Sequence, residues 1–370
     1  MRECATVRLR EGSYFIFALF FSALRESLRQ ILERNRNMLT LDRVKMMAER
    51  GRHIEVAKAG DDELGPLTLL PGVWENTSEL NGRGWNLIAL PFADGPFGYR
   101  LLMNQYNEKL HFTEVDKGVP NRGINADGQT GQTDQVVVAL GYDQTITQIA
   151  GGDSPDSGIA GDADGKPIHK EPGLWLYMTN FTTDKIDIAR LGSVPHGDSL
   201  LALGTAEEIE GAPTIGTVNG LPLGVTHDLD KNKYLAPYKH FEDNPFRGVF
   251  SPVDATKLLR GAVPGNITKT TVLHVDSTLD HAGVNNIPFI VRQANAVSMN
   301  STFWIQETDL KDADGNPRVF LQYAQSVMLD FFGRRDGNPG LIQWPHISIN
   351  TMERTSTPEL TDVQKEVATS

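Results

Sequence analysis

"RVFLQYAQSVMLDFF" (318–332) and "LIQWPHISINT" (341–351) are two apolar runs near the end of the chain, separated by "GRRDGNPG" (333–340). Both runs are rich in branched and aromatic residues, whereas Gly, Asp, Asn and Pro fill the gap between them. This is the pattern of two antiparallel strands joined by a short turn. The second run also contains His346, which is either a packed core residue or a ligand-binding one.

The same alternation of apolar runs and turn-forming residues repeats through most of the chain. From about residue 66 onward, short apolar runs alternate with polar stretches, and the 35 Gly and 20 Pro of the chain disfavour long helices there. A parallel sheet would need a helix between successive strands. We therefore predict a mainly β protein, an antiparallel up-and-down β-barrel of about ten strands. The candidate strands are residues 84–92, 99–106, 109–115, 135–149, 173–181, 186–194, 199–209, 271–279, 300–310, 318–332 and 341–351.

The beginning of the chain has a different character. Apolar residues lie at helical spacing between residues 24 and 52, so we predict that residues 1–62 form a helical N-terminal extension. Residues 63–355 form the predicted barrel domain, with insertions near 116–167 and 212–270 and a helical pattern at 252–261. Residues 356–370 are predicted to be a flexible tail.

The segment "YFIFALFFSAL" (14–24) follows three arginines and has the order of a secretory signal. It is too short to cross a bilayer as a helix, so we predict no integral membrane span. The predicted location is the cytoplasm, and export is the alternative if residues 1–24 act as a signal.

Charge and cysteine content exclude several classes of function. The net charge is −12, and residues 1–60 are basic, so the remainder carries the acidic excess. Nucleic acid is therefore not expected as a partner, because binding to phosphates needs clustered positive charge. Cys4 is the single cysteine, which excludes an intrachain disulfide and a cysteine-based zinc or iron–sulfur site.

Common catalytic motifs are missing from the sequence. No two of the nine histidines have the spacing H-x-x-x-H or H-x-H, and the nucleophile elbow, the Walker loop and G-x-G-x-x-G are absent. "DADG" occurs at 162–165 and 312–315, but Ala160 and Leu310 would occupy the first ligand position of a calcium loop. Both stretches therefore indicate Asp-Gly turns.

Short stretches along the chain follow one another in an order known from one protein family. They are "LPGVWENTSEL" (70–80), "LIALPF" (87–92), "LLMNQYNEKLHF" (101–112), "IHKEPGLWLYM" (168–178), "ARLGSVPHGDSLLALG" (189–204), "FLQYAQSVMLDFF" (320–332) and "HISINTMER" (346–354). In this order they resemble strands of the nitrobindin-like haem-binding β-barrels. The departures are a body nearly twice as long, Val73 in place of the usual threonine, and Pro345 directly before the histidine.

The resemblance implies haem b as cofactor and His346 as the metal ligand, at the start of the closing strand. It also implies that His169 faces the cofactor, and Trp344 and Trp74 are the aromatic residues expected beside it. A neutral imidazole on a strand is able to offer a nitrogen to iron without burying a permanent charge. The alternative is that each of these side chains belongs to an ordinary core or strand residue that binds no ligand.

The implied function is chemistry on small oxidants, as a peroxynitrite isomerase or a peroxidase-like protein. The alternative is a carrier of a lipid-like or other hydrophobic small molecule without chemistry, because small barrels also enclose such guests. A weaker third hypothesis uses His169 and Glu171 as an acid–base pair on a small substrate. The sequence leaves the assembly open between a monomer and a homodimer.

Overall fold

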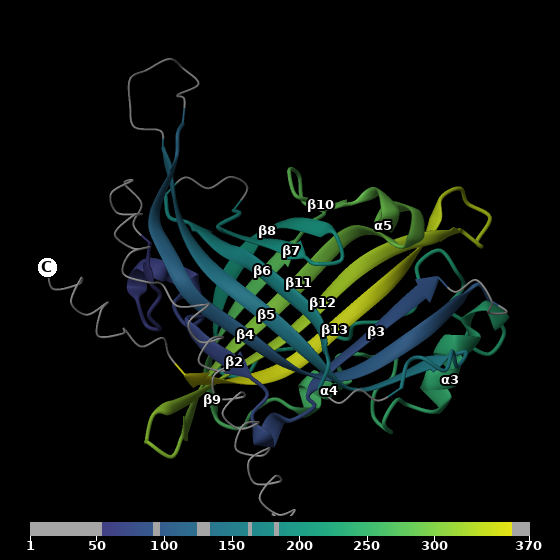
Figure 1. Ribbon diagram of the computed structural model, residues 1–370. Coiled ribbons are helices and arrows are strands. Elements are labelled where there is room, and N and C mark those ends of the chain that lie inside the picture. Colours follow the sequence, from purple (N-terminus) through teal and green to yellow (C-terminus); the bar gives the residue numbers. More distant parts are fainter. Residues whose placement is uncertain (1–53, 92–96, 124–133, 162–164, 181–184, 357–370) are drawn as a thin grey trace, which may run out of the picture.

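The computed structural model describes residues 54–91, 97–123, 134–161, 165–180 and 185–356 as a closed antiparallel β-barrel of ten strand positions (Figure 1). Each strand from β4 to β9 pairs with the next, β9 pairs with β11, and β11, β12 and β13 pair in turn, while β4 and β13 are joined through β2 and β3. The strands are β1 (Ile54–Val56), β2 (Gly72–Glu75), β3 (Gly84–Pro91), β4 (Tyr99–Asn121), β5 (Gln135–Ser154), β6 (Pro167–Met178), β7 (Ile188–Val194), β8 (Asp198–Glu210), β9 (Ile267–Asp276), β10 (Gly283–Asn286), β11 (Asn295–Lys311), β12 (Pro317–Gly333) and β13 (Leu341–Ser356).

Thirteen strands fill ten positions because two positions are divided. β3, β2 and β1 lie one after another along the same side of β4, and β9 and β10 lie one after another along β8. The remaining elements are short helices: η1 (Asp62–Leu67), η2 (Ser78–Leu80), η3 (Lys233–Leu235), α3 (Ala236–Asp243), α4 (Lys257–Gly261) and α5 (Pro288–Gln293). The prediction of a mainly β, antiparallel barrel of about ten strands is thus confirmed.

Residues 211–266 form a strap that runs over the outside of the barrel between β8 and β9 and carries η3, α3 and α4. Outward-facing Leu87 and Ile347, which pair across β3 and β13, are buried in one core cluster with Phe250 and Leu259 of the strap. The amide of Gln322, on the outer face of β12, donates to the carbonyl oxygen of Leu259 at 2.9 Å. These strands are apolar on both faces because the strap turns an outer surface into core.

The interior of the barrel has two unlike halves. The filled half contains inward-facing side chains that are at most 3% exposed, namely Trp74, Phe112, Trp175, Phe303, Leu321 and Met352. In the other half, which we call the open half, Trp344 is buried on the same face of β13 as His346, but six inward-facing side chains are partly exposed. These are His169, Leu200, Gln325, Val327, His346 and Ser348.

Pro345 lies where β13 changes its neighbour. Ile347 pairs with Leu87 of β3, whereas Gln343 exchanges two backbone hydrogen bonds with Leu223 of the strap, at 2.8 and 3.2 Å. The nitrogen of residue 345 faces this same side of the strand, in the gap between the two partners, because N–H directions alternate along a strand. A proline fits here because no backbone carbonyl at this position needs the N–H that proline lacks.

Three predicted boundaries differ from the structure or lie outside it. The helical extension lies mostly outside the described residues, but Ile54–Val56 form β1, so the barrel begins before residue 63. The predicted insertion at 116–167 was wrong over most of its length, because residues 116–121 and 135–154 form the long β4–β5 hairpin. The insertion at 212–270 corresponds to the strap, with α4 inside the predicted helix. The tail beyond Ser356 lies outside the described residues.

Among the helices that the structure describes, none combines the length and the apolar character that crossing a bilayer requires.

Candidate functional site

His346 points into the open half of the barrel. It pairs with Val327 of β12 and shares its face of β13 with Asn350, whose amide reaches the enclosed Glu108 at 3.0 Å. Neither ring nitrogen of His346 has a hydrogen-bond partner within the described ranges. Burial, with smaller contributions from His169 and His196, lowers the pKa of His346 to about 4. At neutral pH the imidazole is therefore uncharged and offers an unused lone pair to the interior.

His169 and His196 lie near the mouth of the same half. His169 is on β6, and its Nε2 atom lies 3.5 Å from Oε2 of Glu171. His196 is an exposed residue of the turn between β7 and β8, and its ring centroid is 6.0 Å from that of His169. Three imidazoles thus gather around the entrance, although their spacing in the sequence gave no sign of it.

A buried ion pair lies below them. The Arg190 guanidinium donates to Oε1 of Glu171 at 2.9 Å, to the Tyr142 hydroxyl at 3.1 Å and to the Gln325 amide oxygen at 2.8 Å. The Tyr142 hydroxyl also donates to Glu171. Burial alone would raise the pKa of Glu171, but the charge of Arg190 and the hydrogen bonds from His169 and Tyr142 outweigh it and hold the value near 2.

A second buried network lies beside the first. The Glu108 carboxylate accepts hydrogen bonds from the Tyr323 hydroxyl at 2.6 Å, the Gln144 amide at 2.6 Å and the Asn350 amide at 3.0 Å. Burial raises the pKa of Glu108, although these three donors oppose the rise. We call both networks together the polar belt: Glu108, Tyr142, Gln144, Glu171, Arg190, Tyr323, Gln325 and Asn350.

The charges of this region restrict what can bind there. Arg190 is the permanent cation of the polar belt, and Glu171 already neutralises it. Asp198 on β8 adds a carboxyl group beside His196, and burial raises its pKa. A guest that places a carboxylate deep inside the barrel would therefore meet no free cation among these residues. A neutral or cationic group is favoured instead.

The two tryptophans predicted beside a cofactor are fully enclosed. Trp344 stacks on Phe331 with ring centroids 4.8 Å apart, and Tyr99 and Tyr238 cover its other sides. Trp74 lies in the filled half and donates from Nε1 to the carbonyl oxygen of Leu70 at 2.8 Å. Trp344 shares its face of β13 with His346, but both tryptophan rings are covered by other side chains, so the candidate site is His346 and His169 without them.

Sequence reasoning missed the polar belt. Arg190 and Glu108 carry the available signal, because each is a charged residue at an inward position whose neighbours two places away on the same face are apolar or glycine. Their partners Tyr142, Gln325 and Asn350 lie on other strands. Nothing in the local sequence links these residues to one another.

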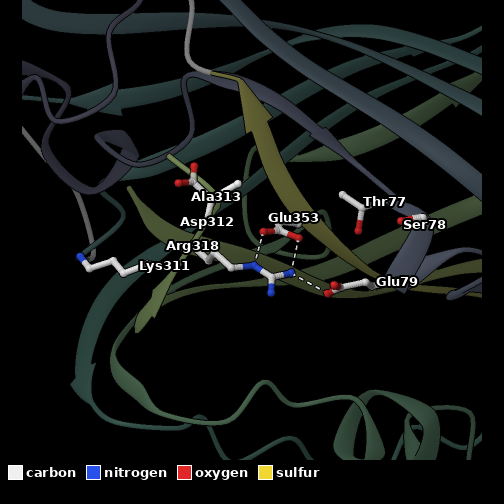
Figure 2. Close-up of a pocket in the computed structure, with 8 residues that line it drawn as sticks. All are labelled: Thr77, Ser78, Glu79, Lys311, Asp312, Ala313, Arg318 and Glu353. Atoms are coloured by element: carbon white, nitrogen blue, oxygen red, sulfur yellow. Dashed lines mark hydrogen bonds and ion pairs between the residues drawn. The ribbon is translucent and has the colours of Figure 1, made fainter. Parts of the chain in front are cut away.

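A shallow polar groove of about 340 Å³ lies at the far end of the barrel, between η2 and the β11–β12 hairpin (Figure 2). Across it, Arg318 donates to both carboxylate oxygens of Glu353, at 2.5 and 2.7 Å, and to Glu79 at 2.9 Å. The opposite charges satisfy each other, so we assign the groove a structural role.

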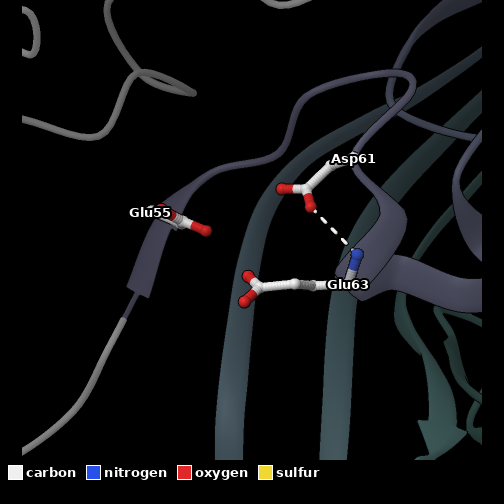
Figure 3. Close-up of side chains that lie close together, drawn as sticks. All are labelled: Glu55, Asp61 and Glu63. Atoms are coloured by element: carbon white, nitrogen blue, oxygen red, sulfur yellow. Dashed lines mark hydrogen bonds between the residues drawn. The ribbon is translucent and has the colours of Figure 1, made fainter.

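Glu55, Asp61 and Glu63 form a cluster of carboxylates on β1 and around the start of η1 (Figure 3). The Lys117 ammonium group lies 2.5 Å from Glu55, 2.5 Å from Asp61 and 2.8 Å from Glu63. A lysine thus supplies the positive charge that a metal ion would bring. The cluster fastens β1 and η1 to β4.

Comparisons with known proteins add little to this picture. No protein-family model matches the chain, and neither does any curated protein. Among solved structures, one match is the crystal structure of Rv2717c from M. tuberculosis, with 14% sequence identity and a TM-score of 0.32, covering 79% of this chain and 95% of that chain. At this TM-score the match carries no argument, and the resemblance to nitrobindin-like barrels stays a prediction.

Proposed function

We propose that this protein binds haem b in the open half of its barrel, with His346 as the ligand of the iron. The observation that carries the proposal is the imidazole itself: it faces the interior, has no hydrogen-bond partner among the described residues, and is neutral at physiological pH. An inward-facing imidazole without a hydrogen-bond partner leaves a polar nitrogen unsatisfied, and a ligand would satisfy it. An iron ion accepts the lone pair that the protein leaves unused.

The surroundings of His346 fit such a guest in two respects. Val327 and Leu200 give the open half apolar surface that is partly exposed and available for contact. The negative balance of the polar belt favours a guest whose carboxylates remain in the solvent at the mouth. Haem has its two propionates on one edge, so it satisfies this requirement when that edge faces outward.

Bound haem would supply an iron centre able to react with small oxidants such as peroxynitrite or peroxides. The chain has separate tasks: His346 holds the iron, the polar belt forms a hydrogen-bonded floor, and the filled half excludes water from the other end. The activity that we propose is peroxynitrite isomerisation or a peroxidase-like reaction.

Titration of the full-length protein with hemin tests the proposal. We expect a Soret band that saturates at one haem per chain and is lost in His346→Ala. His240→Ala is the matched control, because His240 is an exposed histidine of α3, away from the barrel interior. The loaded protein should then convert peroxynitrite to nitrate faster than the His346→Ala variant. A Soret band that is equal in both variants would remove His346 as the ligand.

A carrier of neutral hydrophobic molecules is the second candidate, and one observation favours it. Ile287, Phe289 and Val291 are about half exposed at and around α5, and the Ile287 backbone N–H is bonded to Gly197 beside His196. An apolar rim next to the entrance suits the capture of a greasy guest. Such a carrier would bind a fluorescent apolar probe equally well in the wild type and in His346→Ala, without a Soret band on addition of hemin.

A further inference from the structure

A second group of ligating side chains lies at the mouth, apart from His346. His169 on β6, His196 in the β7–β8 turn and Asp198 at the start of β8 lie on consecutive strands of the barrel. The register of Gly173 opposite Gly192, extended four residues beyond the last paired residues, puts residues 169 and 196 opposite each other. Two imidazoles and a carboxylate are thus held together by neighbouring strands.

The geometry of the two rings is close to that of a metal site. Two imidazoles bound to one tetrahedral zinc ion have centroids roughly 5 Å apart, given Zn–N distances of about 2.0–2.1 Å. The centroids of His169 and His196 are 6.0 Å apart, with ring planes at 36°. Among the described residues, the ligand atoms of His169, His196 and Asp198 do not all lie within 4.8 Å of one another, so the side chains would have to move together to share one ion.

Glu171 lies next to His169, where its carboxylate can orient the imidazole ring. Its Oε2 atom lies 3.5 Å from Nε2 of His169, while its other oxygen is occupied by Arg190 and Tyr142. A histidine that ligates a metal usually donates its second N–H to such a carboxylate, which fixes the ring and strengthens the ligand. Nδ1 of His169 would then be the nitrogen that binds the metal.

Asp198 supplies an independent observation, because one of its carboxylate oxygens lacks a hydrogen-bond partner. Its Oδ1 atom is buried and has no hydrogen-bond partner within the described ranges, although the carboxyl group lies close enough to His196 to feel its charge. A bound cation would stabilise an enclosed carboxylate oxygen that has no hydrogen-bond donor.

We propose that His169, His196 and Asp198 form a binding site for a divalent transition-metal ion of the zinc class at the mouth of the barrel, with Glu171 orienting His169. Imidazole nitrogens and one carboxylate oxygen are ligands that suit zinc, cobalt and nickel. The site shares His169 with the haem site described above but does not include His346, the proposed iron ligand.

Calorimetric titration of the tag-free, full-length chain with zinc chloride tests this site, and cobalt chloride gives a visible spectrum as a second readout. We expect one ion per chain, and at least tenfold weaker binding in His169→Ala and in His196→Ala. His196→Ala is the safer variant because His196 is an exposed turn residue. His240→Ala is the matched control and should bind zinc like the wild type.

Hemin titration of the same variants separates the two proposals. His196→Ala should keep the Soret band and lose zinc binding, whereas His346→Ala should lose the Soret band. The metal site is refuted if the wild type binds no zinc at micromolar concentrations. It is equally refuted if His169→Ala and His196→Ala both keep the wild-type zinc affinity.

Discussion

The two halves of the barrel interior are built from the same strands but differ in how tightly their inward-facing side chains pack. In the filled half, inward positions hold large apolar side chains such as Phe303 and Leu321 that leave almost no exposed surface. In the open half, the same strands place Gln325, Val327 and His346 inward, and all three remain partly exposed. The filled half can thus support the fold, which leaves the open half free to carry imperfectly satisfied groups.

The polar belt separates the halves, so breaking it should have the largest effect. In Arg190→Met, the Glu171 carboxylate remains buried without its cation, and we expect the free energy of unfolding to fall by about 3–5 kcal/mol. Urea unfolding at pH 7 measures this loss. The double variant Arg190→Met/Glu171→Gln should recover part of it. A loss below about 1 kcal/mol in the single variant would contradict the assignment of the belt as a structural division.

A matched pair of leucines compares the two halves directly. Leu321→Ala in the filled half should cost about 3 kcal/mol, because the surrounding side chains leave a cavity that cannot collapse. Leu200→Ala in the open half should cost about 1 kcal/mol, since Leu200 is already partly exposed. Denaturant unfolding of both variants checks the ratio. Equal losses would show that the open half is packed as tightly as the filled half.

Acid should weaken the apoprotein through His346. Its pKa is about 4 in the folded state against about 6.5 in the unfolded chain, so between these values only the unfolded chain takes up the proton. Stability therefore falls as pH drops from 6.5 to 4, by about 2–3 kcal/mol from this group. His346→Gln should flatten that part of the profile of unfolding free energy against pH. A profile unchanged in the variant would mean that the imidazole is not buried in the folded state.

Pro345→Ala should have a small effect. The new N–H would face the gap between β3 and the strap, where it replaces no lost bond and meets no carbonyl in either strand pairing. Since residue 345 is buried, this N–H without an acceptor should lower the unfolding free energy by about 1 kcal/mol. Thermal unfolding of the variant beside the wild type is sufficient to see this. A loss of 2 kcal/mol or more would show that the ring of the proline itself packs in the core.

The barrel was predictable because its evidence is local. The alternation of apolar runs with turn residues marks most of the strands, and "GRRDGNPG" marks the last turn before His346. The strap was recognised as an insertion, but its effect on Leu87 and Ile347 was not, since burial of an outer face depends on a remote segment. The β4–β5 hairpin was misjudged because its polar residues from Asp116 onward resemble a loop.

The candidate site was predictable only in part. His346 was identified through a resemblance, and the structure places it inward. The tryptophans show the limit of inferring a site from sequence proximity. Trp344 is close to His346 in the sequence, but its ring packs against other aromatic residues in the structure. The contact of His169 with His196 depends on strand pairing. The sequence does not reveal that pairing, because the two residues are far apart along the chain.

The proline in the last strand also decides which way the histidine faces. If β13 slipped by one residue along β12, every side chain of the strand would change sides and His346 would point outward. Such a slip would bring the nitrogen of Pro345 opposite a carbonyl that requires a donor, which proline does not have. Residue 345 therefore acts as a register pin for the final strand. Any change of sequence that shifts this pin by one position would turn the interior imidazole to the outer face without removing it.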